Sequence, residues 1–165
     1  GVVHGDPECL NGWALAADAP IDRSDLANWF EESRVDIIAS THTCVAHLSS
    51  VFDDEHNGEL PTKVVANNGA AGMPNFDATL SSCWEKSEGG LVTRVASQSA
   101  PAPPVDALYG VTLAETGTSV DALPVRYDRE AWLADDFLPL WPEGSPAHVS
   151  YYARIRRGLA GWTPD

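Results

Sequence analysis

The sequence is poor in positive charge and in cysteine. Lys and Arg together number 10 against 24 Asp and Glu, which gives a formal net charge of -14. A nucleic-acid backbone would repel such a chain, so we expect no sequence-independent binding of nucleic acid. The 3 cysteines are an odd number and do not suggest a disulfide framework. This favours a reducing compartment and predicts a cytoplasmic protein.

Long apolar runs are also missing. No run approaches the roughly 18–20 residues that span a bilayer, and no secretory segment opens the sequence, so we expect no membrane partner. The 165 residues, 44% hydrophobic and 21% charged, predict a single domain over residues 1–165 with a real core. The sequence starts at Gly1, and "GVVHGD" looks like a strand entering a loop. We therefore expect an upstream part of the same protein.

Helix and strand signals alternate along the chain, which predicts an α/β fold with a mixed sheet. In the first helix, Leu26, Trp29 and Phe30 fall on one face. Pro139 is expected to end the second helix, and Ser145 and Gly158 punctuate the third. The predicted strands are residues 1–4, 35–40, 45–54, 63–67, 89–97, 106–113 and 119–128. The predicted helices are 24–34, the stretch 129–141 as far as Pro139, and 145–158.

Three polar loops follow predicted strands, at His4–Glu8, Ser40–Cys44 and Asn67–Phe76. Loops at one edge of an α/β sheet converge, so we expect these segments to face one another. Together they offer two histidines, a thiol, carboxylates and amides. Imidazole and carboxylate ligands suit Zn²⁺, Mn²⁺ or Fe, so the loops are candidates for a metal site.

The three loops resemble a known family. The stretches "VVHGDP", "DIIASTHT" and "VVANNGAAGMPNF" are similar, in this order, to the C-terminal half of calcineurin-like metallophosphoesterases. In that family an apolar strand precedes "HG", another precedes "GHTH", and a third precedes an Asn-containing turn. The resemblance covers roughly residues 1–95. It implies a calcineurin-like αββα sandwich that is incomplete in this chain.

The resemblance also implies roles for single residues. His4 matches the "HG" histidine and His42 the first histidine of "GHTH", and both would bind the same divalent metal ion. Cys44 stands where the family has a second histidine, a ligand of the other metal. As a thiolate it would favour zinc. Asn67 matches the Asn of the turn, and Asn67 and Asn68 either orient substrate or support a turn with positive φ.

By this resemblance the complete protein would hydrolyse a phosphoester, or another small-molecule substrate, at a dinuclear-type site. The family's earlier "DxH", "GD" and "GNH" motifs have no counterpart here, and no catalytic residue is identified. The alternative is a catalytically silent binding or structural domain that keeps the fold without the metals. A third hypothesis is a thiol-dependent enzyme that uses Cys44 with His42.

The remaining polar and aromatic residues are given ordinary structural roles. Asp6 and Glu8 are expected to be solvated carboxylates, and His47 and His56 to have no function. We expect His148 to cap or pack a helix, and the basic end of that helix at residues 154–157 to oppose the helix dipole. A set of aromatic residues is expected to form core and helix packing: Trp84, Trp132, Phe137, Trp141, Tyr151 and Tyr152.

Overall fold

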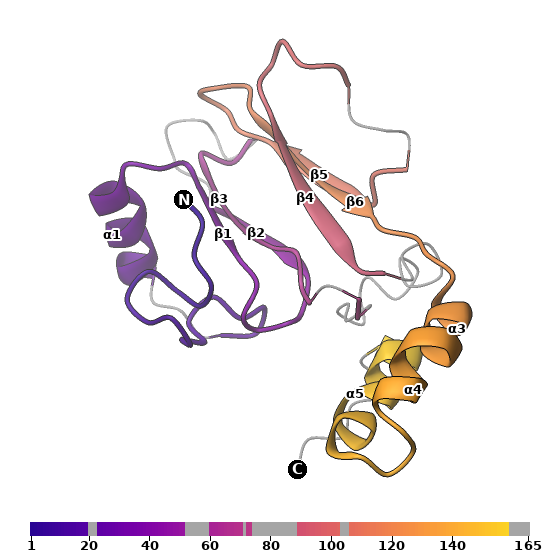
Figure 1. The fold of residues 1–165 in the computed structure, drawn as a ribbon. Coiled ribbons are helices and arrows are strands. Elements are labelled where there is room, and N and C mark those ends of the chain that lie inside the picture. Colours follow the sequence, from indigo (N-terminus) through magenta and orange to yellow (C-terminus); the bar gives the residue numbers. More distant parts are fainter. Residues whose placement is uncertain (20–22, 52–59, 71, 74–88, 103–105, 159–165) are drawn as a thin grey trace.

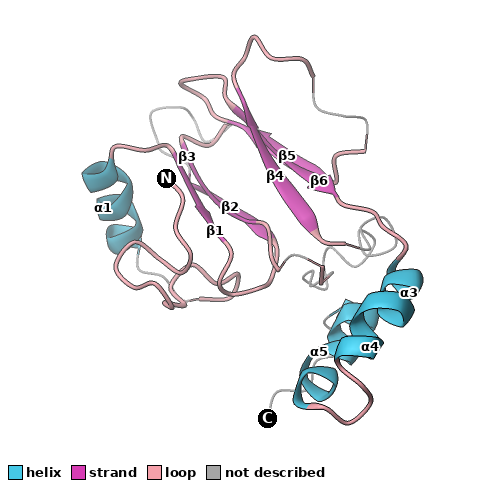
Figure 2. Cartoon of the chain, viewed as in Figure 1, coloured by secondary structure: helices cyan, strands magenta, loops and turns pink. Residues whose placement is uncertain are grey.

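The computed structural model describes residues 1–19, 23–51, 60–70, 72–73, 89–102 and 106–158. These residues form a mixed α/β structure with two small sheets, a helix beside the first sheet and a helical segment at the C-terminal end (Figures 1 and 2). The predicted α/β class is therefore confirmed. None of the described helices is both long and apolar enough to cross a membrane.

The first sheet has the strand order β1-β3-β2. β1 (Ile37–Ser40) runs parallel to β3 (Lys63–Asn67), and β2 (His47–Val51) runs antiparallel to β3. The N-terminal residues extend this sheet, because Val2 forms a parallel bridge with Ala39. The N-terminal segment, β1 and β3 therefore all point toward the same edge, and β2 starts from it.

The second sheet is antiparallel and has the order β4-β6-β5. Its strands are β4 (Leu91–Ala96), β5 (Tyr109–Thr112) and β6 (Ser119–Pro124). An ion pair joins two of the strands: Arg94 Nη1 of β4 lies 2.9 Å from Asp121 Oδ2 of β6. The Asp121 carboxylate is buried and also accepts a hydrogen bond from the Ser119 hydroxyl.

The first sheet is covered on both faces because its strands are apolar on both sides. Ile38 and Val65 point toward α1 (Arg23–Ser33), where they form one core cluster with Leu26, Trp29 and Phe30 of the helix. This confirms the predicted buried face of that helix. On the opposite face a second core cluster joins the two sheets, and it consists of Val64, Ala66, Leu113 and Val120. The layers are thus helix, mixed sheet and antiparallel sheet (Figure 1).

The C-terminal segment folds into α3 (Arg129–Trp132), the π-helical turn η2 (Leu133–Phe137), α4 (Leu138–Leu140) and α5 (Pro146–Arg157). The wide turn lies just before Pro139, which has no N–H to donate to the preceding turn. The prediction that Pro139 ends the helix is wrong by a short margin, since the helix continues to Leu140. Ser145 caps α5 by accepting a hydrogen bond from His148 N, and Gly158 ends it, as predicted.

The aromatic residues of this segment divide into two groups. Trp132, Phe137 and Tyr152 pack around one small core, as expected. Trp141 and Tyr151 are exposed, which corrects the prediction of core packing for both. Trp141 lies at the end of α4 and Tyr151 in the first half of α5, and about half of each side chain is exposed. Trp84 and His56 lie outside the described residues.

His148 and the basic end of α5 behave as expected. The His148 ring stacks on Tyr152 with 4.7 Å between ring centroids. Three arginines occupy the last turn of α5, where positive charge complements the helix dipole. One of them, Arg156, donates to the Glu130 carboxylate of α3, and this neighbour raises the pKa of the guanidinium above its ordinary value.

Candidate metal centre at the edge of the first sheet

The three predicted loops do meet at one edge of the first sheet. Backbone hydrogen bonds join the first two: the N–H groups of Thr41 and His42 both donate to the carbonyl oxygen of His4, at 3.2 and 2.8 Å. The third loop joins through Thr41, whose hydroxyl donates to the carbonyl oxygen of Gly69 at 2.6 Å. The parallel direction of the strands causes this meeting, because all three loops leave the sheet at the same edge.

The two histidines that were expected to share a metal lie side by side. His4 Nε2 is 3.1 Å from His42 Nδ1, and the two rings meet edge to face with 4.9 Å between centroids. His4 is exposed and His42 is half-buried, so the facing nitrogens are close to solvent. Two residues 38 positions apart in the sequence thus form one pair of nitrogen donors.

The spacing of the two nitrogens suits a shared metal ion. Two nitrogens that each lie about 2.0–2.1 Å from one zinc ion are about 3.3 Å apart at the tetrahedral angle, and about 2.9 Å apart at a right angle. The observed 3.1 Å falls between these two values. The same spacing also suits a hydrogen bond between two rings, in which one donates and the other accepts. The pair can therefore hold either a proton or a metal ion.

Cys44 belongs to the same loop but not to the same donor group. Its thiol donates to the carbonyl oxygen of His42 at 3.3 Å, whereas the His42 ring faces His4. No set of three or more His, Cys, Asp or Glu side chains within the described part of the chain is arranged to hold one metal ion. Cys44 therefore does not complete a three-ligand site with the two histidines.

The backbone of Cys44 is in the left-handed region, with φ of 61°. Few residues other than glycine adopt this conformation. Here it closes a tight turn, in which Cys44 N–H donates to the carbonyl oxygen of Thr41 at 3.0 Å. The turn lets the chain reverse between β1 and β2, and it leaves His42 at the tip.

Asn67 holds the loops together from inside. It is 1% exposed, and its amide nitrogen donates to the hydroxyls of Ser40 and Thr43 at 3.2 and 2.9 Å. Its amide oxygen accepts the N–H of Gly69 at 2.8 Å, where φ is 72°. Of the two predicted roles, these contacts favour support of the turn. The neighbouring Asn68 is half-buried and donates to the carbonyl oxygen of Leu91 at 3.4 Å.

The acidic residues after His4 are structural. Asp6 is buried, and its carboxylate accepts hydrogen bonds from the N–H groups of Glu8, Cys9 and Ala14. The prediction of a solvated Asp6 is therefore wrong, because the loop wraps its own N–H groups around this side chain. Glu8 is exposed but accepts a hydrogen bond from the indole of Trp29 at 2.9 Å, which ties the loop to α1.

One residue of the site was missed by the sequence interpretation. Trp13 lies next to His42, with 5.5 Å between ring centroids and 73° between ring planes. It is 62% exposed. The only signal in the sequence was an aromatic residue in the loop that follows the His4 segment, and such a residue is more often buried.

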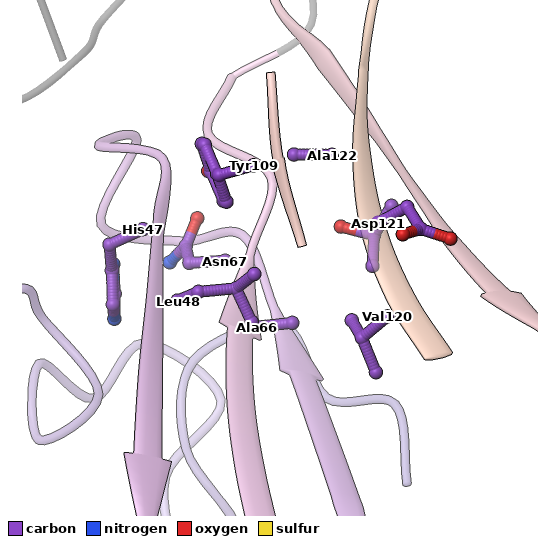
Figure 3. Close-up of a pocket in the computed structure, with 9 residues that line it drawn as sticks. His47, Leu48, Ala66, Asn67, Tyr109, Val120, Asp121 and Ala122 are labelled. Carbon is purple, nitrogen blue, oxygen red and sulfur yellow. The ribbon is translucent and has the colours of Figure 1, made fainter. Parts of the chain in front are cut away.

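A narrow pocket lies between the two sheets (Figure 3). It is too narrow to admit a water molecule. His47 borders it, is buried, and has its Nδ1 3.2 Å from the carbonyl oxygen of Val45. The remaining lining residues come from β2 to β6 and are Leu48, Ala66, Asn67, Thr93, Tyr109, Val120, Asp121 and Ala122. Neither His4 nor His42 lines it, so we place the candidate site outside this pocket.

Comparisons with models of protein families, with curated proteins and with solved structures find no match to this chain.

Proposed function

We propose that this chain contributes to a metal-dependent phosphoesterase of the calcineurin-like type, in which His4 and His42 bind one divalent metal ion. The observation that carries this proposal is the 3.1 Å distance between His4 Nε2 and His42 Nδ1. The two nitrogens come from loops at one edge of the first sheet, one after the bridge of Val2 to Ala39 and one after β1, and α/β proteins commonly bind ligands at such an edge. Zn²⁺, Mn²⁺ and Fe are the candidate metals, because imidazole suits all three.

The layer order supports the proposed fold. A helix, a mixed sheet and an antiparallel sheet are stacked in this sequence. An αββα sandwich contains the same three layers and a fourth, helical layer outside the second sheet. On the strand β4, Val92 alternates with the inward-facing Leu91 and Thr93 and is about half exposed, so the outer face of the second sheet is open at this position. We propose that the described residues form the inner part of such a sandwich.

The chain's own residues would bind and orient the metal. Neutral imidazoles are required, so each metal-binding nitrogen must give up its proton. The backbone bonds from Thr41 and His42 to His4 fix the distance between the two loops before any metal binds. When bound, the metal ions would supply Lewis-acid polarisation of the phosphoryl group. Two imidazoles do not complete a coordination shell, so the proposal requires further ligands from outside the described residues.

Cys44 and the two asparagines keep more limited roles in this proposal. Cys44 would be a ligand of the second metal only as a thiolate, and that requires its thiol to leave the His42 carbonyl oxygen. The buried amide of Asn67 uses both its nitrogen and its oxygen within the protein, so we assign it to positioning the loops. Asn68, which is half-buried, is the better candidate for contact with substrate.

Metal binding tests the proposal directly. Titration calorimetry with Zn²⁺ and with Mn²⁺ should detect a site that His4→Ala and His42→Ala each weaken at least tenfold, because each removes one ligand. His148→Ala is the matched control, since His148 stacks on Tyr152 in the C-terminal segment. If all three variants bind metal as tightly as the wild type does, the two histidines are only hydrogen-bonded and the proposal is rejected.

Catalysis is tested in the complete protein. Hydrolysis of p-nitrophenyl phosphate and of its diester should depend on added metal and should be lost in His42→Ala. Full activity in that variant contradicts the assignment. No hydrolysis by the metal-loaded protein would favour the alternative, a silent domain that keeps the fold.

Alkylation distinguishes the thiol-dependent alternative from the metal-dependent proposal. The Cys44 thiol contacts a carbonyl oxygen, and the ring of His42 contacts His4 and Trp13. We therefore expect slow alkylation of Cys44 by iodoacetamide at neutral pH, no faster than that of the exposed Cys9. A Cys44 that reacts many times faster than Cys9, with activity lost in step, would support a nucleophilic thiol instead.

A further inference from the structure

Trp13 is an exposed aromatic residue in direct contact with His42, one of the two proposed metal ligands. Its ring is 62% exposed and meets His42 nearly at a right angle, with 5.5 Å between centroids. His42 in turn contacts His4, so the three rings form a continuous row. Tryptophan is usually largely buried because it is the largest apolar side chain. Exposure at this place leaves a large apolar ring beside His42 and so next to the proposed metal site.

The backbone around Trp13 is fixed on both sides. On one side, Gly12 N–H donates to the carbonyl oxygen of Cys9 at 3.0 Å, and on the other, Ala16 N–H donates to the carbonyl oxygen of Trp13 at 3.0 Å. Ala14 N–H donates to the buried carboxylate of Asp6. These bonds fix the backbone that carries the ring, and the edge-to-face contact with His42 restrains the ring itself. A ring held in this way loses little conformational entropy when a ligand stacks on it.

The chemistry of the indole ring and of the neighbouring site narrows the class of ligand that Trp13 could contact. A ring face attracts other planar rings through offset stacking, and it also attracts cations. The neighbouring site is proposed to hold metal ions and the phosphoryl group of a substrate, so the group on Trp13 has to be joined to a phosphoester. A planar group attached to the phosphoester satisfies both requirements.

We propose that Trp13 is a specificity-determining residue that stacks on a planar ring of the substrate, either an aryl group or a nucleobase. This inference rests on the proposed function, because it places the phosphoryl group at the His4–His42 pair. It narrows the substrate class to phosphoesters that carry a planar ring. Stacking of a ring on an aromatic side chain is worth about fivefold to a hundredfold in affinity, and we expect roughly tenfold at this exposed site.

Binding of three phosphonates to the zinc-loaded complete protein tests the inference without hydrolysis. Phenylphosphonate carries a planar ring, cyclohexylphosphonate carries a ring of similar size that is not planar, and methylphosphonate carries no ring. We expect phenylphosphonate to bind about tenfold more tightly than the other two, by calorimetry. In Trp13→Leu the preference should fall to twofold or less, and Trp13→Phe should restore most of it. Trp141→Leu, which changes an exposed tryptophan of the C-terminal segment, should keep the full preference.

The outcomes separate this inference from the proposed function. If all three phosphonates bind equally, or if cyclohexylphosphonate binds as well as phenylphosphonate, the stacking role is rejected and the phosphoryl site stands. If none binds, both are rejected. A preference for phenylphosphonate that does not require zinc supports the stacking role and contradicts the metal site. If Trp13→Leu changes only the sedimentation of the protein, Trp13 covers an interface between copies and the inference is wrong.

Adenosine 5′-monophosphate and phenyl phosphate show whether the ring that stacks on Trp13 is a nucleobase or an aryl group. Both are measured as competitors of phenylphosphonate, in the wild type and in Trp13→Leu. Tighter competition by the nucleotide assigns a nucleobase to Trp13, and tighter competition by phenyl phosphate assigns an aryl group. If the Trp13→Leu variant binds both as tightly as the wild type does, the stacking role is overturned.

Discussion

Replacement of Asn67 by alanine should destabilise the protein strongly. The side chain is 1% exposed and makes three hydrogen bonds, to the hydroxyls of Ser40 and Thr43 and from the N–H of Gly69. Alanine leaves these three partners without Asn67, and both hydroxyl-bearing residues are themselves buried. A buried hydrogen bond contributes about 1 kcal/mol, and a buried group left unsatisfied costs about 1–3 kcal/mol. We therefore expect a loss of about 3 kcal/mol in the free energy of unfolding.

Urea unfolding measures this loss. For a slope of about 2 kcal/mol per molar urea, a loss of about 3 kcal/mol lowers the midpoint by about 1.5 M. The measurement needs a chelator in the buffer, so that metal binding does not add to the stability of one variant and not of another. Asn68→Ala is the matched control at the neighbouring position. That side chain is half-buried and makes one long hydrogen bond, so we expect a loss of at most about 0.5 kcal/mol.

The result that would refute the reasoning is equally specific. If Asn67→Ala unfolds within about 0.5 M urea of the wild type, the three hydrogen bonds do not hold the loops, and the positioning role fails. If that stable variant also loses affinity for phosphonates, Asn67 contacts the ligand after all. Loss of stability in Asn67→Ala with normal behaviour of Asn68→Ala supports the assignment made from the structure.

Two further substitutions test the packing on either side of the site. Gly12→Ala would place a Cβ 1.7 Å from Asp6 Oδ2 and 2.5 Å from its Cγ, so the carboxylate must leave its three N–H donors. We expect thermal or urea unfolding to show a loss of about 2–3 kcal/mol in the free energy of unfolding. A loss below about 0.5 kcal/mol would show that the loop adapts to the added methyl group. Arg94→Met leaves the buried Asp121 carboxylate without its cation and should cost about 3 kcal/mol. The double variant with Asp121→Leu should recover most of this loss. A double variant no more stable than Arg94→Met would contradict the ion-pair explanation.

Local sequence patterns predicted the elements well where packing and propensity agree. The face of Leu26, Trp29 and Phe30 is buried as expected, because helical spacing puts these residues on one side. The return strand over residues 63–67 is found with the predicted bounds, since a short apolar run between polar loops leaves little choice. Strand ends were predicted less well. The strand expected over 119–128 stops at Pro124, where the pairing with Leu91 ends.

Contacts between residues that are far apart in the sequence explain the larger errors of the sequence-based predictions. Asp6 was expected in solvent because most carboxylates are, and nothing local shows that three N–H groups surround it. The sequence does not identify Trp13 as a residue of the site, because its neighbour His42 is 29 positions away. The meeting of the His4 and His42 loops was predictable, because it depends only on parallel strands that end at one edge. The distance between the two ring nitrogens was not, because it depends on side-chain torsions.

The loops that carry the two histidines are held by bonds that do not involve the imidazole rings, so substitution of either ring tests metal binding directly. The backbone joins their loops, through the N–H groups of Thr41 and His42 and the carbonyl oxygen of His4. The buried amide of Asn67 supports one of these loops from the opposite side. None of these bonds uses an imidazole ring. Removal of either ring should therefore leave the loops in place, so that a loss of metal affinity in His4→Ala or His42→Ala would report on the ligand itself and not on the fold.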